Sequence, residues 1–181
     1  MELTDAIKGR RSIRKFTDRV IPTQVIEKIV EEASYSPSWK NSQTPRYIYL
    51  TNREIIDKIA NEMLFGFEHN KEILNGCAGI MVVAYVTKIA GFDRDGSFST
   101  PKGDGFEMFD AGIATQTLCL SAHNQGIGTV ITGYFDERPI HKLLELPENQ
   151  EIGALVCMGY PDEEPPEHKR RELSQILSYM E

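Results

Sequence analysis

Residues 107–135 read EMFDAGIATQTLCLSAHNQGIGTVITGYF, and the rest of the chain can be arranged around them. Across the first two-thirds of this stretch, apolar and small residues recur at helical spacing, on two stripes that together cover much of a helix surface. The spacing predicts a buried helix that ends at Gly126, a residue that tolerates the left-handed conformation of a helix stop. Asp110, Gln116 and His123 are polar positions on this helix, and they need partners inside the protein or at its edge.

A β-branched run follows the predicted helix. Residues 129–132, TVIT, favour a central strand, and Gly133 ends it where a backbone can approach a flat ligand without interference from a Cβ atom. A helix that leads directly to the edge of a strand is typical of a ligand site. The same pattern also fits a helix and strand that only build the core, so this stretch alone leaves both interpretations open.

The composition indicates one globular domain. The chain has 181 residues, of which 40% are hydrophobic, and this is enough for a sizeable core. No apolar run approaches the ~20 residues of a membrane-spanning helix, and the N-terminus lacks the apolar core of a signal peptide. The three cysteines lie far apart without a CxxC pair, and the four histidines are dispersed. We therefore expect a cytoplasmic protein with reduced thiols, no metal site and no membrane contact.

The charge is distributed unevenly along the chain. A net charge of -7 argues against nucleic-acid binding. Residues 8–19 nevertheless carry six basic side chains against one acidic side chain, and residues 168–171, HKRR, form a second basic cluster near the other terminus. The two clusters either converge on one anion or form separate solvated faces, and the charge pattern permits both.

Apolar periodicity predicts the remaining elements. Helices are expected at residues 3–8 and 23–36, after Asn52, after Asp136 and in the tail LSQILSYM, and strands at residues 46–51, 80–86 and 152–158. Residues 64–76 are expected to form a loop or short turn. Residues 88–105, rich in Gly, Asp and Ser, are expected to form a mobile surface loop of the kind that acts as a lid. Residues 161–168 should run extended because their prolines break helices and strands.

The loop SPSWKNSQTP, residues 36–45, contains the only tryptophan of the chain beside Asn41 and Gln43. Amide side chains donate and accept hydrogen bonds in one plane, as the pyrimidine edge of a flavin or a nucleobase requires of a partner. Polar loops anchored by a tryptophan also serve purely structural roles, so the loop by itself does not identify a site.

The residues that could perform chemistry point to a bound cofactor. No GxGxxG or GxxxxGK[ST] motif is present, since GDGFEM at residues 103–108 lacks the third glycine. The run RRSIR at residues 10–14 suits a phosphate, because guanidinium groups bind phosphate oxygens in pairs and the serine adds a hydroxyl donor. No spacing of Ser, Cys, His and Asp suggests a nucleophile. The reactive group must therefore be supplied by a cofactor.

Four motifs occur in the order shown by a known family: RRSIRKF, then SPSWKNSQ, then DAGIATQTLCLSAHNQGIGT with its following strand, and finally GYP followed by PP and KRR. In these motifs the chain resembles the flavin-dependent nitroreductases over nearly its whole length. The resemblance implies a single α+β domain over residues 1–181, with a central mixed β-sheet flanked by helices. It also implies an intertwined homodimer in which residues 161–181 pack on the partner chain and one FMN lies at each end of the interface.

The resemblance also implies which residues bind FMN. The basic turn would hold phosphate or ring oxygens with help from the tail, a loop would reach the ring from the partner chain, and the end of a strand would lie along the ring. These residues are Arg10, Arg11, Ser12 and Arg14 in the turn, Pro37, Ser38, Trp39 and Asn41 in the loop, Ile131, Thr132 and Gly133 in the strand, and Lys169 and Arg171 in the tail. Gln116 is a further candidate, and Asn70 in HNKE is a candidate for the pyrimidine end if the family pattern is shifted.

The activity implied by the resemblance needs no catalytic side chain, because FMN carries the redox chemistry. NADH or NADPH would reduce the flavin, leave, and be replaced by a small-molecule oxidant such as a nitroaromatic or a quinone. Two alternatives stay open. One is a related flavin enzyme that performs reductive dehalogenation or flavin breakdown, and the other is a catalytically idle flavin-binding or anion-binding module.

Overall fold

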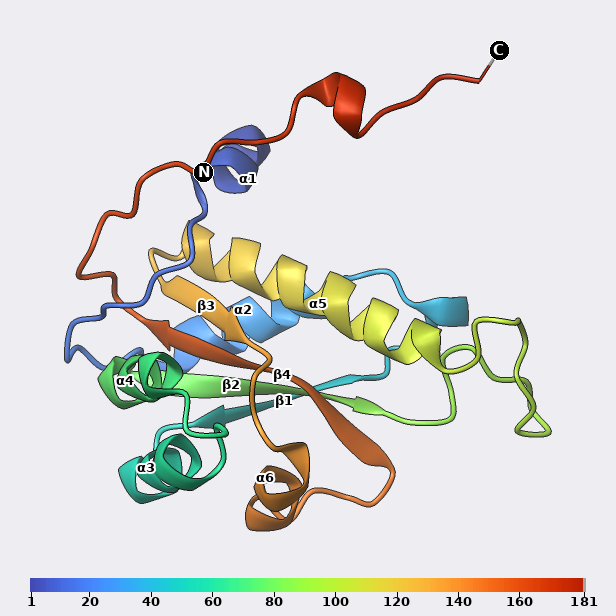
Figure 1. The fold of residues 1–181 in the computed structure, drawn as a ribbon, viewed down its shortest axis with the longest axis horizontal. Helices are drawn as coiled ribbons and strands as arrows, with labels where there is room; N and C mark the ends of the chain where they lie inside the picture. The colour runs from blue at the N-terminus through green and yellow to red at the C-terminus, as the bar shows by residue number, and fades with distance from the viewer. Residues whose placement is uncertain (181) are drawn as a thin grey trace.

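A four-stranded antiparallel sheet forms the centre of the computed structural model, which describes residues 1–180 (Figure 1). The strands lie in the order β1-β2-β4-β3. All eight residues of β2 are buried, because β2 lies inside the sheet and helices cover both faces. The strands span Pro45–Leu50 (β1), Gly79–Val86 (β2), Gly128–Thr132 (β3) and Gln150–Gly159 (β4).

Helices account for most of the remaining regular structure and confirm the α+β class. The α-helices span Leu3–Gly9 (α1), Thr23–Ser34 (α2), Arg53–Glu62 (α3), Glu68–Gly76 (α4), Gly105–Asn124 (α5) and Glu137–Leu143 (α6). Two short 3-10 helices span Trp39–Asn41 (η1) and Leu173–Gln175 (η2). Within residues 1–180, no helix combines the length and the apolar character needed to cross a membrane.

The alternation of side chains along β2 creates a core on each face of the sheet. Met81 belongs to the face covered by α2 and α5, together with Ile29 and Leu118. The next residue, Val82, belongs to the opposite face, where Leu74 of α4 is fully buried and α3 and α6 also pack (Figure 1). One side of α5 is therefore committed to the core, whereas its other side lies at the surface.

The expectation of a loop over residues 64–76 is wrong, because residues 68–76 form α4. Phe65 and Gly66 take positive φ angles of 49° and 72° and turn the chain just before the helix. The helix begins with the polar run EHNKE, and only its second half brings the apolar residues Ile73 and Leu74 to the core. This short, polar start conceals the helical spacing in the sequence.

β3 is an edge strand, which corrects the expectation of a central strand at residues 129–132. The N-terminal segment runs beside it: Ser12 and Thr129 form a parallel bridge, and the Ile13 backbone N–H donates to the Thr129 carbonyl at 3.0 Å. Among the described residues this bridge is the only parallel pairing, since all four strands pair antiparallel. The expected mixed sheet is thus not formed within one protomer.

The C-terminal segment leaves the sheet after β4. It first follows the N-terminal segment, where Phe16 and Pro161 form a bridge and the Asp162 N–H donates to the Lys15 carbonyl at 3.0 Å. Figure 1 then shows it passing α1 and extending away from the body of the protein. The predicted helical tail is wrong except for η2, since a helix this short is not stable without a packing partner. Its apolar side chains are exposed: Leu173, Ile176, Leu177, Tyr179 and Met180.

Two glycines allow the N-terminal segment to lie against the sheet. A Cβ atom at Gly128 would come within 2.8 Å of the Ile13 side chain, and one at Gly159 would come within 2.7 Å of the Phe16 ring. Both distances are shorter than real Cβ contacts, so any larger residue must displace the segment that carries the basic turn.

We expect Gly159→Ala to lower the free energy of unfolding by about 1–3 kcal/mol, the usual cost of overpacking a filled site. Gly76→Ala is the control, because nothing lies within 4 Å of the added carbon. The control should change the free energy by less than about 0.5 kcal/mol. Urea denaturation followed by circular dichroism measures both values, and equal effects of the two changes would contradict the close-packing argument.

Candidate functional site

The basic turn at residues 10–14 is fixed through hydrogen bonds to the backbone. Arg11 Nη1 donates to the Arg10 carbonyl at 3.1 Å, and Arg11 Nη2 lies 3.8 Å from the Glu167 carboxylate. Arg14 Nη1 donates to the Ser12 carbonyl at 3.3 Å. Within residues 1–180, the Arg10 guanidinium makes no hydrogen bond or ion pair, although it is half-buried. Arg10 is therefore the cation of the turn that is free to bind a ligand.

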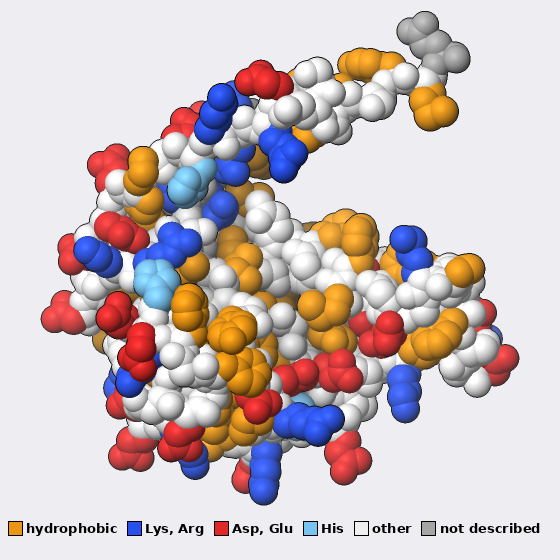
Figure 2. Space-filling view, viewed as in Figure 1, with side chains coloured by type: hydrophobic (Ala, Val, Ile, Leu, Met, Phe, Trp, Pro, Cys, Tyr) orange, Lys and Arg blue, Asp and Glu red, His pale blue; other side chains and the backbone are white. Residues whose placement is uncertain are grey.

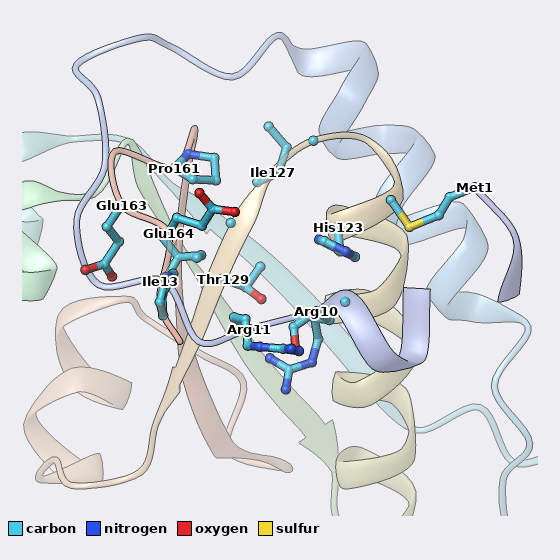
Figure 3. Close-up of a pocket in the computed structure, with 14 residues that line it drawn as sticks. Met1, Arg10, Arg11, Ile13, His123, Ile127, Thr129, Pro161, Glu163 and Glu164 are labelled. Carbon is cyan, nitrogen blue, oxygen red and sulfur yellow. The ribbon is translucent and has the colours of Figure 1, made fainter. Parts of the chain in front are cut away.

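A cavity of about 430 Å³ lies beside the Arg10 and Arg11 side chains (Figure 3). His123, near the end of α5, faces the two arginines, and its pKa is lowered by burial and by their positive charge. Glu163 and Glu164 line the other side of the cavity. The side next to α5 thus has a positive potential and suits an anion such as a phosphate.

Arg14 faces a different cavity, of about 470 Å³, which it shares with side chains of α4. His69 and Glu72 line this cavity, whereas Asn70 is buried and does not line it. The sequence interpretation missed His69 and Glu72 because it assigned this segment to a loop. Their separation by three residues would have placed them on one side of a helix, so recognition of α4 would have found them.

The end of β3 offers an open backbone surface. Ile131 is 49% exposed, whereas Thr132 is buried and its hydroxyl donates to the Leu155 carbonyl at 2.9 Å. Nothing lies within 4 Å of the position that a Cβ atom would take at Gly133. A flat ligand can therefore lie against the backbone of these three residues without displacing a side chain.

Three exposed aromatic side chains connect the end of β3 with α4. The ring centroids of Phe65 and Phe67 lie 5.2 Å and 5.7 Å from that of Tyr134. The Phe67 and His69 ring centroids are 6.2 Å apart. The open backbone around Gly133 and the cavity lined by His69 thus belong to one continuous surface.

The loop at residues 36–43 is held on α5, near the start of that helix. The Trp39 backbone N–H donates to the Asp110 carboxylate at 2.8 Å, and the ring centroids of Trp39 and Phe106 are 4.4 Å apart. Asp110 is 3% exposed, and burial raises its pKa. Asn41 is exposed and takes a positive φ of 55°, so its amide is presented to solvent by a tightly turned backbone.

The two groups of candidate residues lie at opposite ends of α5. Asp110 holds the loop near one end, and His123 lies with Arg10 near the other. Asp110 and His123 are thirteen positions apart on the helix, which corresponds to roughly 20 Å at 1.5 Å per residue. Within one protomer, the structure does not bring Pro37, Ser38, Trp39 and Asn41 to the basic turn.

The remaining candidates also lie apart from the basic turn in one protomer. Lys169 and Arg171 lie on the exposed tail, where with Arg170 they line a shallow surface that contains neither Arg10 nor Arg14. Gln116 is exposed on α5. The convergence of the two basic clusters thus stays a prediction.

We expect Asp110→Ala to release the loop at residues 36–43, because the Trp39 N–H loses its acceptor. Trp39 is the only tryptophan in the chain, so its fluorescence reports directly on the loop and should shift to longer wavelength. Asp110→Asn keeps an acceptor oxygen and should emit like the parent protein. Gln116→Ala, at an exposed position of the same helix, is the control. Unchanged emission from Asp110→Ala would show that other contacts hold the loop.

The chain is similar to known proteins over most of its length. The model of the nitroreductase family matches residues 7–160. The chain therefore belongs to the nitroreductase family.

Three relatives illustrate the range of the family. A Methanothermobacter thermautotrophicus protein named "Putative NADH dehydrogenase/NAD(P)H nitroreductase" is 33% identical over 91% of this chain and 80% of its own. An iodotyrosine deiodinase of Haliscomenobacter hydrossis is 27% identical over 93% of this chain and 84% of its own. A Desulfovibrio desulfuricans nitroreductase-like protein, crystallised in complex with FMN, has a TM-score of 0.75 at 23% identity and covers 100% of this chain and 98% of its own.

Proposed function

We propose that this protein is a cytoplasmic, FMN-dependent NAD(P)H oxidoreductase that reduces nitroaromatics, quinones or similar small oxidants. The observation that carries the proposal is the half-buried Arg10 guanidinium, which lacks a partner within residues 1–180 and lies on the positively charged side of a cavity. Family membership and the FMN found in the Desulfovibrio desulfuricans structure support the choice of cofactor.

The residues fit the phosphate of FMN. Arg10 is free to donate, whereas Arg11 is held by the Arg10 carbonyl and by Glu167 and would support the turn. The Ser12 hydroxyl lies within the same turn. Lys169 and Arg171 would join the phosphate once the exposed tail packs against a partner chain. Charged hydrogen bonds of this kind are strong, so FMN should bind tightly without a covalent link.

The residues also fit the flavin ring. The backbone of Ile131, Thr132 and Gly133 is open, because the Thr132 side chain is turned to the Leu155 carbonyl. Arg14 would donate to a ring oxygen, and His69 and Glu72 share its cavity at the place where the sequence suggested Asn70. When bound, FMN would accept a hydride from NADH or NADPH and reduce the oxidant. The side chains would bind and orient the cofactor and take no proton.

We further propose that the enzyme is a homodimer with shared sites. Roughly 20 Å of α5 separates Asp110, which holds the loop at residues 36–43, from His123, which lies beside Arg10. The loop is thus away from the Arg10 cavity of its own chain and would reach the flavin of a second copy. Met108 and Phe109 of α5 are 51% and 61% exposed, and the tail carries five exposed apolar side chains. A two-fold partner would cover both surfaces.

Reductive dehalogenation is the second candidate function, because the related protein from Haliscomenobacter hydrossis is an iodotyrosine deiodinase. It would use the same cofactor site. Release of iodide from 3-iodotyrosine, compared with reduction of nitroaromatics and quinones under the same conditions, distinguishes the two activities.

The direct test is the cofactor itself. The purified protein should be yellow, should release FMN on denaturation, and should lose its flavin absorbance when NADH or NADPH is added without oxygen. If no FMN is released, and added FMN neither binds nor raises the melting temperature, the proposed function is wrong. Bound FMN that neither nicotinamide reduces would leave only a flavin-binding module.

We expect Arg10→Ala and Arg171→Ala each to weaken FMN binding by about 1.5–3 kcal/mol, the worth of a hydrogen bond to a charged group. Arg170→Ala should have a smaller effect. Fluorescence titration of the protein freed of FMN measures the three dissociation constants. Equal and negligible effects would mean that the two basic clusters are separate solvated faces.

We expect inactive protomers that carry Arg10→Ala and Asn41→Ala to complement each other when mixed. One of the two sites in a heterodimer would then contain an intact Arg10 from one chain and an intact Asn41 from the other, so part of the activity should return. Subunit exchange is verified with differently tagged chains. No recovery after proven exchange, or a protein that sediments as a monomer while it holds FMN, would remove the shared-site proposal and leave the flavin proposal standing.

A further inference from the structure

A cleft of about 650 Å³ lies between the loop at residues 36–43 and the loop that follows β2. We call it the basic cleft. The lining residues are Trp39, Lys40 and Ser42 from the first loop and Lys88, Ile89, Phe92, Asp93 and Arg94 from the second. Figure 1 shows the second loop projecting beyond the sheet at the start of α5.

The loop that follows β2 has a defined structure of its own. Phe92 and Phe98 form a bridge between two short arms, and their ring centroids are 4.9 Å apart. The Asp93 N–H donates to the Ser97 carbonyl at 2.8 Å. Residues 91–99 thus form a hairpin, which gives one wall of the basic cleft a fixed shape.

An ion pair joins the two walls. Lys40 Nζ lies 3.4 Å from Asp93 Oδ1, and the Ser99 hydroxyl donates to the same oxygen at 2.6 Å. These two contacts lower the pKa of the Asp93 carboxyl, with Ser99 as the larger cause. Lys40 Nζ also lies 5.5 Å from the centroid of the Trp39 ring. The hairpin is thereby attached to the loop that we propose reaches the partner's flavin.

The basic cleft has an excess of positive charge. It contains the cations Lys40, Lys88 and Arg94 against one carboxylate, Asp93, in a chain whose net charge is -7. Asp93 is occupied by Lys40, whereas the Lys88 ammonium and the Arg94 guanidinium make no hydrogen bond or ion pair within residues 1–180. The Lys88 backbone N–H donates to the buried Glu107 carboxylate, and this hydrogen bond fixes the position of the Lys88 backbone at the edge of the cleft. Two free cations therefore face one cleft.

We propose that the basic cleft binds an anionic group of a substrate and thereby selects anionic substrates for the partner's flavin. This inference rests on the proposed function, because it places the cleft beside that flavin through the loop at residues 36–43. The anionic group belongs either to the oxidant, as a carboxylate, or to the electron donor, as the 2′-phosphate that distinguishes NADPH from NADH. Both are recognised by the same chemistry, a charge-assisted hydrogen bond from Lys88 or Arg94.

Matched substrates separate charge from shape. We expect kcat/KM for 4-nitrobenzoate to exceed that for the similarly shaped, neutral 4-nitrobenzamide if the oxidant supplies the anion. If the donor supplies it, kcat/KM for NADPH should exceed that for NADH. Either preference should decrease as the salt concentration rises, since an exposed charge pair is screened.

Three variants of the holoenzyme test the residues. Arg94→Gln should lower kcat/KM for the preferred anionic substrate roughly tenfold, mainly through KM, as expected for the loss of one charged hydrogen bond. Arg94→Lys should restore most of the loss. Lys102→Gln, in the same connection but outside the cleft, is the control and should behave like the parent.

Trp39 provides a readout that does not depend on turnover. Because this single tryptophan lines the cleft, its quenching by added 4-nitrobenzoate or NADPH should saturate at a lower concentration in the parent than in Arg94→Gln. The inference is overturned if charged and neutral partners are used and bound equally, or if Arg94→Gln and Lys102→Gln have the same effect. A protein that holds no FMN but still shows charge-selective quenching would refute the proposed function while supporting the anion site.

Discussion

The rigid length of α5 is the constraint on which the arrangement of the candidate site depends. Asp110 accepts the Trp39 N–H near the start of this helix, and His123 lies with Arg10 near its end. The helix between them is rigid, so the roughly 20 Å that separates Asp110 from His123 cannot shorten by a local movement. Within one chain, the Arg10 guanidinium and the amide-bearing loop are therefore held apart. A second copy, related by a two-fold axis, is the simplest way to bring the two kinds of group to one ligand.

The part of the candidate site around the basic turn depends on the close approach of the N-terminal segment to β3 and β4. The basic turn can lie beside β3 because Gly128 and Gly159 present no side chains to Ile13 and Phe16. Once the segment is in place, the guanidinium groups of Arg11 and Arg14 are partly satisfied by nearby carbonyls, and Arg10 is left without a partner in the described residues. The three arginines of the turn can therefore lie close together, because carbonyl oxygens offset part of the positive charge of Arg11 and Arg14. At the basic cleft, too, one cation is paired and others are free: Asp93 pairs with Lys40, whereas the side chains of Lys88 and Arg94 have no partner within residues 1–180.

The sequence predicted the elements whose buried face has a clear period. The spacing in α2 and α5, and the cap at Asn52, whose side chain accepts the Glu54 N–H at 3.0 Å, were sufficient for these helices. The prediction from sequence failed where a segment is buried by something other than its own place in the sheet or helix layer. β3 has the β-branched run of a central strand because the N-terminal segment covers its outer side, and a residue pattern reports burial rather than position in a sheet. The tail shows helical spacing but has nothing to pack against in one protomer.

The candidate site was predictable to the extent that single residues have distinctive chemistry. Arginines beside a serine indicate a site for a phosphate. A glycine at the end of a strand indicates space for a flat ring. Neither prediction requires knowledge of the fold. Recognition of α4 would have been enough to find His69 and Glu72. The basic cleft became visible only with the hairpin, because the cleft combines segments far apart in the sequence. Spacing along a chain carries no information about such contacts.

The exposed apolar surfaces connect stability with activity. Each protomer exposes Met108 and Phe109 on a helix and five apolar side chains on its tail. Exposed apolar surfaces of this kind are typical of interaction sites. In the proposed dimer, the association that covers this surface also delivers the loop at residues 36–43 and the attached hairpin to the partner's flavin. Cofactor binding and substrate binding would then both depend on the equilibrium between monomer and dimer. Any ligand that binds only the assembled site stabilises the dimer by mass action. Loss of the interface would expose apolar surface and divide the site at the same time, so a stable monomer with partial activity is not an expected intermediate.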